Sequence, residues 1–228
     1  MLGKKWVDMP TISKENYLKA VYSRKTESGG GATTSELAEK LEISNAAISD
    51  MAKKLSEQGL ITYAKYKGME LTSKGEKLAL KVIRRHRLWE LFLIQVLGLS
   101  WSEVHDEAEN LEHSTSDFLI DKIDEYLGYP KFDPHGDPIP QKNGTIPKTP
   151  EVIELKNAEV GVKYKIGRVN DSSSELINYL TKIGIKLAKE IEIVEKLSFD
   201  NSVIVKIDSK NHSLSEVVAS NVFLERLN

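Results

Sequence analysis

The sequence contains no cysteine, which excludes disulfides, thiolate metal ligands and cysteine nucleophiles and is typical of a reducing compartment. It has no apolar run long enough to cross a bilayer, and its first residues, MLGKKWVDMPTISKENY, lack the apolar region of a signal peptide. We therefore expect a cytoplasmic protein with no membrane partner. Because 228 residues exceed the usual length of one domain, we expect two or three domains.

The net charge of −2 is distributed unevenly along the chain. Residues 1–75 contain 12 Lys and Arg against 9 Asp and Glu, whereas residues 76–130 contain 6 against 11. A mildly basic first part suits phosphate, and an acidic middle part suits cations.

The first third of the chain has the pattern of a DNA-binding module. Apolar residues at helical spacing predict a helix over about 13–24, and two short helices follow, capped by Thr34 and Ser44 and joined by a tight turn. This is the helix-turn-helix arrangement. The sequence LITYAKYKGMEL then predicts a β-hairpin around Lys67 and Gly68, which would be the wing. We assign residues 1–75 to a winged helix-turn-helix domain.

The middle of the chain is predicted to be helical. Two capping-box sequences, SKGE starting at Ser73 and SWSE starting at Ser100, open helices that we expect to reach about residues 97 and 113. A third helix is expected over 117–127. Residues 76–128 would form a helical domain, and its apolar residues suit a homodimer core: Phe118, Leu119, Ile123 and Leu127.

The last part of the chain changes character. Six of the seven prolines lie in residues 129–150, which we interpret as a linker between domains. Beyond it, KYKIGRV, EIEIVEK and SVIVKID alternate as strands do, and ELINYLTKIG reads as a helix between the first two. Residues 151–228 therefore predict a small β-barrel.

Potential metal ligands gather on the two successive helices of the middle domain. At about 100° per residue, four side chains of HDEAENLEH fall within an arc of roughly 100° on one helix face. His86 and Glu90 on the preceding helix form an i,i+4 pair. The four side chains on the second helix are His105, Glu109, Glu112 and His113.

These residues permit more than one interpretation. They could be a solvated acidic face, although six residues of metal-ligand type on two adjacent helices make a metal site the better hypothesis. Nitrogen and oxygen donors without sulfur favour Mn²⁺ or Fe²⁺ and would admit Zn²⁺ or Co²⁺. A hydrolytic dinuclear centre is a second chemical possibility. Against it, the ligands directly follow a DNA-binding module, and we find no separate nucleophile or phosphate-binding loop.

Three segments carry a family resemblance: RRHRLWE at 84–90, VHDEAENLEH at 104–113 and PHGDPIP at 134–140. In order and spacing the chain resembles the diphtheria-toxin-repressor (DtxR) family of metal-dependent regulators, and most closely its manganese-responsive (MntR-like) branch. The resemblance implies a mainly α fold with a small β portion. That fold comprises a winged helix-turn-helix, a helical dimerisation domain and a C-terminal SH3-like barrel of the FeoA type.

The resemblance also implies a ligand set. His86, Glu90 and His105 would form one metal site, and Glu109, Glu112 and His113 most of a second. Glu109 stands where the iron-responsive branch has cysteine, which favours Mn²⁺. The ligand position on the first helix is occupied by Asn16, and Lys19 stands where the manganese branch has a further glutamate, so a dinuclear arrangement does not transfer intact. From the C-terminal domain we expect Glu175 as a donor, with Asp171 as the alternative; both could instead cap the helix that follows.

In a helix-turn-helix the second helix presents its N-terminal residues to base edges in the major groove. The side chains expected there are small, so sequence reading would depend on thymine methyl groups and DNA shape: Ser44, Asn45, Ala46, Ala47, Ser49 and Asp50. Four lysines would hold phosphates, unless they are merely solvated: Lys53, Lys54, Lys65 and Lys67.

The sequence thus predicts a homodimeric repressor that controls metal homeostasis, binds double-stranded operator DNA and is activated by Mn²⁺, with Fe²⁺ as the alternative activator. It would not be an enzyme. Two other classes stay open from the residues alone: a metal-dependent hydrolase with an accessory helix-turn-helix, and a winged-helix module that binds only proteins.

Overall fold

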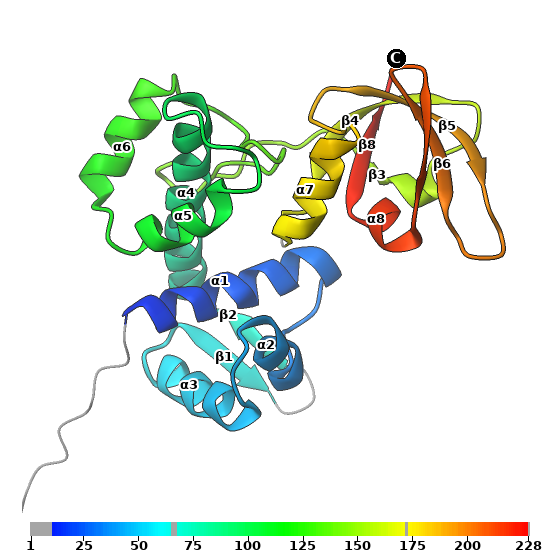
Figure 1. Ribbon diagram of the computed structural model, residues 1–228. Helices are drawn as coiled ribbons and strands as arrows, with labels where there is room; N and C mark the ends of the chain where they lie inside the picture. Colours follow the sequence, from blue (N-terminus) through cyan, green and yellow to red (C-terminus); the bar gives the residue numbers. More distant parts are fainter. Residues whose placement is uncertain (1–10, 65–67, 172, 228) are drawn as a thin grey trace, which may run out of the picture.

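The structure is a computed structural model, and it describes residues 11–64, 68–171 and 173–227. Its first part contains three helices and a two-stranded antiparallel sheet (Figure 1). These are α1 (Thr11–Ser28), α2 (Thr34–Lys40), α3 (Asn45–Glu57), β1 (Ile61–Ala64) and β2 (Gly68–Leu71). A short turn joins α2 to α3, and the β1–β2 hairpin follows α3, so the predicted winged helix-turn-helix is confirmed.

Capping side chains explain where the two short helices begin. The Thr33 hydroxyl accepts the backbone N–H of Glu36, whose carboxylate in turn accepts the N–H of Thr33. The predicted cap at Thr34 is therefore wrong by one residue, because the reciprocal pair needs the spacing of Thr33 and Glu36. Ser44 caps α3 as predicted, since its hydroxyl accepts the N–H of Ala47.

The helix α4 (Ser73–Gln95) is the longest described helix and extends about 35 Å at 1.5 Å per residue. It runs from the wing into the helical part of the molecule (Figure 1). Its cap is Thr72, whose hydroxyl accepts the N–H of Gly75, and not the predicted Ser73. A Cβ at position 75 would overlap the carbonyl of Leu60, so glycine allows α4 to leave the wing at close range.

Two shorter helices pack beside α4, namely α5 (Val104–Glu112) and α6 (Asp117–Tyr126). The SWSE sequence forms only half of the predicted capping box: the backbone N–H and the hydroxyl of Ser100 both donate to the Glu103 carboxylate, whereas the Glu103 N–H donates to the backbone carbonyl of Ser100. The helix nevertheless starts only at Val104, since residues 101–103 form a turn. The predicted cap at Ser100 is therefore wrong by three residues, because Glu103 holds the cap position.

The first half of the proline-rich segment packs against the helical part, whereas residues 141–150 are mostly exposed. Ile139 is buried with Leu88 and Leu91 of α4. The guanidinium of Arg87 lies 3.3 Å from the Asp133 carboxylate and donates to the Pro138 carbonyl at 2.5 Å. Prolines preclude helix and central strand here, as predicted, but they do not make the segment a free tether.

The C-terminal part contains a six-stranded antiparallel sheet in the order β3-β8-β4-β5-β6-β7. The fold class is thus as predicted, mainly helical with a small sheet domain at the end. Three strands match the alternating runs, whereas β3, β7 and β8 were not predicted. The elements are β3 (Ile153–Glu154), a 3-10 turn (Leu155–Asn157), β4 (Lys163–Val169), α7 (Ser174–Lys182), β5 (Glu190–Lys196), β6 (Val203–Ile207), β7 (Lys210–Leu214), α8 (Glu216–Ser220) and β8 (Val222–Arg226).

Direct contacts place the sheet domain beside α4 and α5. The carbonyl of His135 accepts the N–H of Val169 at the end of β4. Trp101, just before α5, packs against the core of the sheet domain and stacks on the His135 ring at 5.3 Å between centroids. Because β4 ends next to this contact, the loop that follows it begins close to α5.

Candidate metal centre

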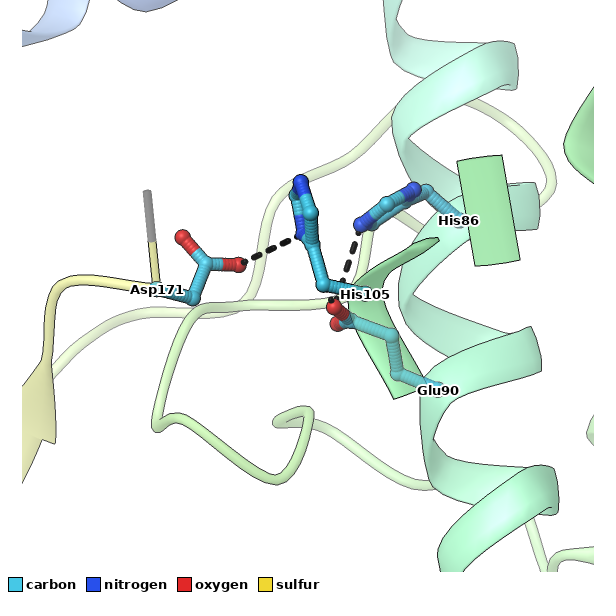
Figure 2. A group of neighbouring side chains, drawn as sticks. All are labelled: His86, Glu90, His105 and Asp171. Atoms are coloured by element: carbon cyan, nitrogen blue, oxygen red, sulfur yellow. Dashed lines mark hydrogen bonds and ion pairs between the residues drawn. The ribbon is translucent and has the colours of Figure 1, made fainter. Parts of the chain in front are cut away.

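Four side chains of metal-ligand type meet where α4, α5 and the loop after β4 come together (Figure 2). Their ligand atoms all lie within 4.8 Å of one another, and we name them the Asp171 cluster: His86, Glu90, His105 and Asp171. One Glu90 oxygen lies 3.1 Å from Nε2 of His86 and 3.5 Å from Nδ1 of His105. That same Nδ1 lies 3.8 Å from an Asp171 oxygen.

The Asp171 cluster contains buried polar atoms that lack a hydrogen-bond partner within the described chain. Glu90 is fully buried, and its Oε2 makes no hydrogen bond. Nδ1 of His105 also makes none. Buried polar atoms are normally paired, because leaving one unpaired costs about 1–3 kcal/mol. The unpaired atoms and the donor types fit a divalent cation.

Electrostatics set the protonation state of this cluster in the metal-free protein. Burial alone would lower the pKa of His86, but the Glu90 carboxylate and hydrogen bonds to Glu112 and Glu90 raise it to about 10. The pKa of His105 is raised by the neighbouring Glu90 carboxylate, against the effects of burial and of His86. Without metal, His86 therefore carries a proton at neutral pH.

Metal binding should consequently release protons, because an imidazole ligates metal in its neutral form. We expect Mn²⁺ affinity to increase as pH rises toward 10, by about tenfold per pH unit for each proton released. The sign follows from the raised pKa: charged His86 stabilises the metal-free fold below about pH 6.5, and this stabilisation is lost as pH approaches 10. Calorimetry in buffers of different ionisation enthalpy measures the proton count. An enthalpy independent of the buffer would contradict the expectation.

A second group of carboxylates lies one turn or more further along α5. Nδ1 of His86 contacts Glu112 at 2.6 Å, so the two ring nitrogens of His86 face different groups. His105 and Glu112 share one helix face but are seven residues, about 10 Å, apart along the axis. The same face of α5 therefore contributes side chains of metal-ligand type to two separate positions. We name the second one the Glu112 cluster: Asn16, Glu109, Glu112 and His113.

The first helix contributes to the Glu112 cluster through neighbouring residues. The Glu15 carboxylate lies at hydrogen-bond distance, 2.6 Å, from Nδ1 of His113. This contact was not anticipated from the sequence. Nε2 of His113 and Oδ1 of Asn16 are buried and make no hydrogen bond within the described residues. Lys19 donates to both Glu109 and Glu112, and its charge lowers the pKa of Glu109 against the opposing effect of burial.

His135 was not among the predicted site residues, although it stands in the PHGDPIP segment. It is fully buried, both ring nitrogens lack a hydrogen bond within the described chain, and Nε2 lies 3.7 Å from Glu90. Its neighbour Asp133 is also buried, and burial raises the pKa of that carboxyl. The sequence signal that could have indicated His135 was a histidine within a proline-rich segment. Its closeness to Glu90, however, depends on how that segment packs against α4.

Of the two side chains that we considered in the C-terminal domain, the one that lies in the cluster is Asp171 and not the preferred Glu175. Asp171 faces His105, as Figure 2 shows, whereas Glu175 is exposed in the first turn of α7 and belongs to neither metal-capable group found in the described residues. The reason is positional, because Asp171 is the second residue after β4 and β4 ends at the His135 contact.

The predicted base-reading residues lie at the start of α3, and Lys53 and Lys54 lie in its second half. Ser44, Asn45, Ala46, Ser49, Asp50, Lys53 and Lys54 are exposed, and Ala47 is half-buried. The hydroxyls of Ser44 and Ser49 are engaged with the helix backbone, as a cap and as a donor to the Asn45 carbonyl. Lys65 and Lys67 lie outside the described residues.

A winged helix-turn-helix joined by one long helix to clusters of histidine and carboxylate defines the class of metal-dependent DNA-binding regulators. Family comparisons agree. "Iron dependent repressor, N-terminal DNA binding domain" matches residues 9–69, "Iron dependent repressor, metal binding and dimerisation domain" matches 72–141, and "FeoA domain" matches 153–226. The chain belongs to the DtxR/MntR family of metal-dependent transcriptional repressors. It is a transcriptional regulator and not a hydrolase.

Both manganese and iron regulators are similar to this chain. The HTH-type transcriptional regulator MntR of Oceanobacillus iheyensis is 37% identical over 125 residues, which are 55% of this chain and 84% of that protein. The iron-dependent repressor IdeR of Mycobacterium leprae is 37% identical over 126 residues, 55% of this chain and 54% of that protein. A solved manganese-dependent transcriptional repressor in complex with manganese has a TM-score of 0.87 at 36% identity, covering 94% of this chain and 100% of that chain. No helix among the described residues could span a membrane.

Proposed function

We propose that Mn²⁺ activates this repressor and that the Asp171 cluster holds one ion. The observation that carries the proposal is the meeting of two imidazoles and two carboxylates within 4.8 Å, with unpaired buried atoms among them. Nitrogen and oxygen donors without sulfur suit Mn²⁺. Asp171 takes the place of Glu175 in the proposed ligand set because of its contact with His105. His135 is a further candidate ligand because its Nε2 is unpaired beside Glu90.

We propose the Glu112 cluster as a second position for a divalent ion. The unpaired Oδ1 of Asn16 and Nε2 of His113 support it, together with the buried carboxylate of Glu112. When bound, a divalent cation supplies the positive charge that balances these carboxylates. The residues then hold together elements that are far apart in sequence: Asn16 lies on α1, Glu112 on α5, and Asp171 in the loop after β4.

The effect on DNA binding follows from that bridging. Metal can favour the DNA-binding arrangement only by as much as it binds that arrangement more tightly than the alternatives. Ligands drawn from α1, α5 and the sheet domain supply such a difference, because their relative positions change with the arrangement of the domains. The proposed domain limits are 1–75, 76–128 and 151–228, with 129–150 connecting the last two.

We further propose that the active form is a homodimer in the cytoplasm that places two α3 helices on double-stranded operator DNA. Phe118 and Leu119 on α6 are exposed and suit an interface. Ile123 and Leu127, predicted for the same role, pack into the core of their own protomer instead. They face α4 because α6 uses that side to cover it.

The direct test is a titration of operator binding by the purified protein with Mn²⁺ and Fe²⁺ under anaerobic conditions. We expect tight binding with Mn²⁺, weak binding without metal, and loss of affinity with rising salt, because lysines contact phosphates. Zn²⁺ and Co²⁺ should act as surrogates. Operator binding that is equally tight in a chelator would contradict metal activation.

Fe²⁺ is the second candidate activator, since the iron-dependent IdeR is as similar in identity as the manganese regulator and Asn16 is a neutral ligand. We expect Glu109→Cys to shift the preference from Mn²⁺ toward Fe²⁺ or softer metals, because a thiolate favours metals later in the first-row affinity order. The ratio of half-activating Mn²⁺ and Fe²⁺ concentrations measures this. The control is Glu107→Cys, an exposed position on α5. An unchanged ratio, with equal activation of the wild type by both ions, would refute the manganese assignment.

A further inference from the structure

Lys19 is the one cation from α1 seen between the carboxylates of the Glu112 cluster in the described structure. Its ammonium donates to Glu109 and to both oxygens of Glu112, at 2.8 and 3.1 Å for the latter pair. The Glu112 side chain is fully buried and the Lys19 side chain is only 21% exposed. This is a partly desolvated, charge-assisted contact, which is stronger than an exposed surface ion pair.

The contact occupies a position that a divalent ion would otherwise take. Glu109, Glu112 and His86 form the second group whose ligand atoms lie within 4.8 Å of one another. The ammonium of Lys19 binds two of these three side chains. A divalent ion placed between the same carboxylates would have to displace the ammonium or lie next to it, and two cations that close repel each other strongly.

Contacts with two carboxylates make displacement of Lys19 unfavourable. An ion that displaced the ammonium would break its hydrogen bonds to Glu109 and to both oxygens of the fully buried Glu112. Lys19 is anchored on α1 one turn from Asn16 and Glu15, and Glu15 holds His113. The Lys19 ammonium therefore lies between the carboxylates because Lys19 is on the same face of α1 as the residues that contribute to the rest of the cluster.

We propose that Lys19 is a built-in cation that fills the place between Glu109, Glu112 and His86, and that it thereby limits how many divalent ions each protomer binds. The inference rests on the proposed metal-binding function and makes it more specific. Two positions then remain for divalent ions: the Asp171 cluster and the Asn16–His113 end of the Glu112 cluster. No pair of metal ions bridged by Glu109 and Glu112 forms. Removing the ammonium opens one more position.

The experiment counts Mn²⁺ ions per protomer by equilibrium dialysis of the full chain, with Mn²⁺ as the probe. Lys19→Met and Lys19→Gln remove the charge, Lys19→Arg keeps it, and Lys25→Met is the control, since Lys25 is an exposed residue of the same helix that pairs with Glu76. We expect both neutral variants to bind one more ion than the wild type. Lys19→Arg and Lys25→Met should match the wild type. Electron paramagnetic resonance should show coupled Mn²⁺ ions only in the neutral variants, because adjacent ions would share Glu112.

The outcomes separate this inference from the proposed function. Equal numbers of ions in the wild type and in both neutral variants, or coupled ions already in the wild type, would overturn the role of Lys19 and leave metal binding intact. Absence of bound Mn²⁺ from every variant would overturn the proposed function together with the inference. Because Lys19→Gln keeps a polar side chain beside the carboxylates, it provides the count if Lys19→Met does not fold.

Discussion

Glu112→Gln is expected to abolish metal-activated operator binding while leaving the fold intact. Glu112 is fully buried and contacts three side chains of the site, namely Lys19, His86 and His113. Glutamine keeps the shape and can still accept a hydrogen bond from Lys19, but it removes the charge that a divalent ion needs. Loss of a ligand should cost more than the 10–100-fold in metal affinity that is typical of residues that only support ligands.

The measurement is operator binding titrated with Mn²⁺, with circular dichroism as the check on folding. Glu107→Gln is the matched control, because Glu107 is an exposed glutamate on the same helix. His113→Ala should behave like Glu112→Gln, since Nε2 of His113 is unpaired and lies 3.3 Å from Glu112. Wild-type metal dependence in Glu112→Gln would show that this cluster is not the activating site.

Local spacing was enough to find most of the candidate site. His105, Glu109 and Glu112 fall on one face of α5 because an α-helix advances 100° per residue, and His86 and Glu90 share a face of α4 for the same reason. Spacing cannot say how the two faces meet. The division into two clusters depends on His86, whose two nitrogens face Glu90 and Glu112 in opposite groups.

Residues that arrive from other elements could not be found in this way. Asp171 and His135 reach Glu90 and His105 only because Arg87 holds the proline-rich segment on α4 and His135 holds the end of β4. Those contacts join residues separated by 46 positions (Arg87 and Asp133) and by 34 positions (His135 and Val169), and no periodic pattern in the sequence predicts them. The same limit applies to Lys19. The sequence shows that Lys19 departs from the expected ligand set, but its contact with Glu112 is a tertiary contact that the sequence pattern does not reveal.

The fold was predictable where pattern and capping chemistry agree. Ser44 and the α2–α3 turn follow from local hydrogen bonding, and the wing follows from two short β-prone runs. The caps at Thr33 and Thr72 were each missed by one residue because adjacent threonine or serine residues offer equivalent hydroxyls, and only the backbone path selects one. The strands β3 and β8 carry too short or too irregular an alternation to be recognised without their partners.

The second large effect concerns the helical domain. Phe118 is 74% exposed and Tyr126 is 70% exposed on α6, within the region that matches a metal binding and dimerisation domain. Large apolar side chains grouped on a surface mark an interaction site. The buried side of α6 already covers α4 through Ile120 and Ile123, so the exposed side is free for a second copy of the chain.

Phe118→Asp is therefore expected to convert the dimer to a monomer and to weaken operator binding by about 100-fold or more, because one recognition helix loses the effective concentration that its partner provides. Sedimentation measures the oligomeric state, and titration of operator DNA at saturating Mn²⁺ measures the affinity. The matched control is Phe199→Asp, since Phe199 is 82% exposed but lies between β5 and β6, far along the chain from α6. The control should remain dimeric and bind the operator normally. A Phe118→Asp protein that stays dimeric, or a monomer that binds the operator as tightly as the wild type, would show that the exposed side of α6 does not assemble the DNA-binding form.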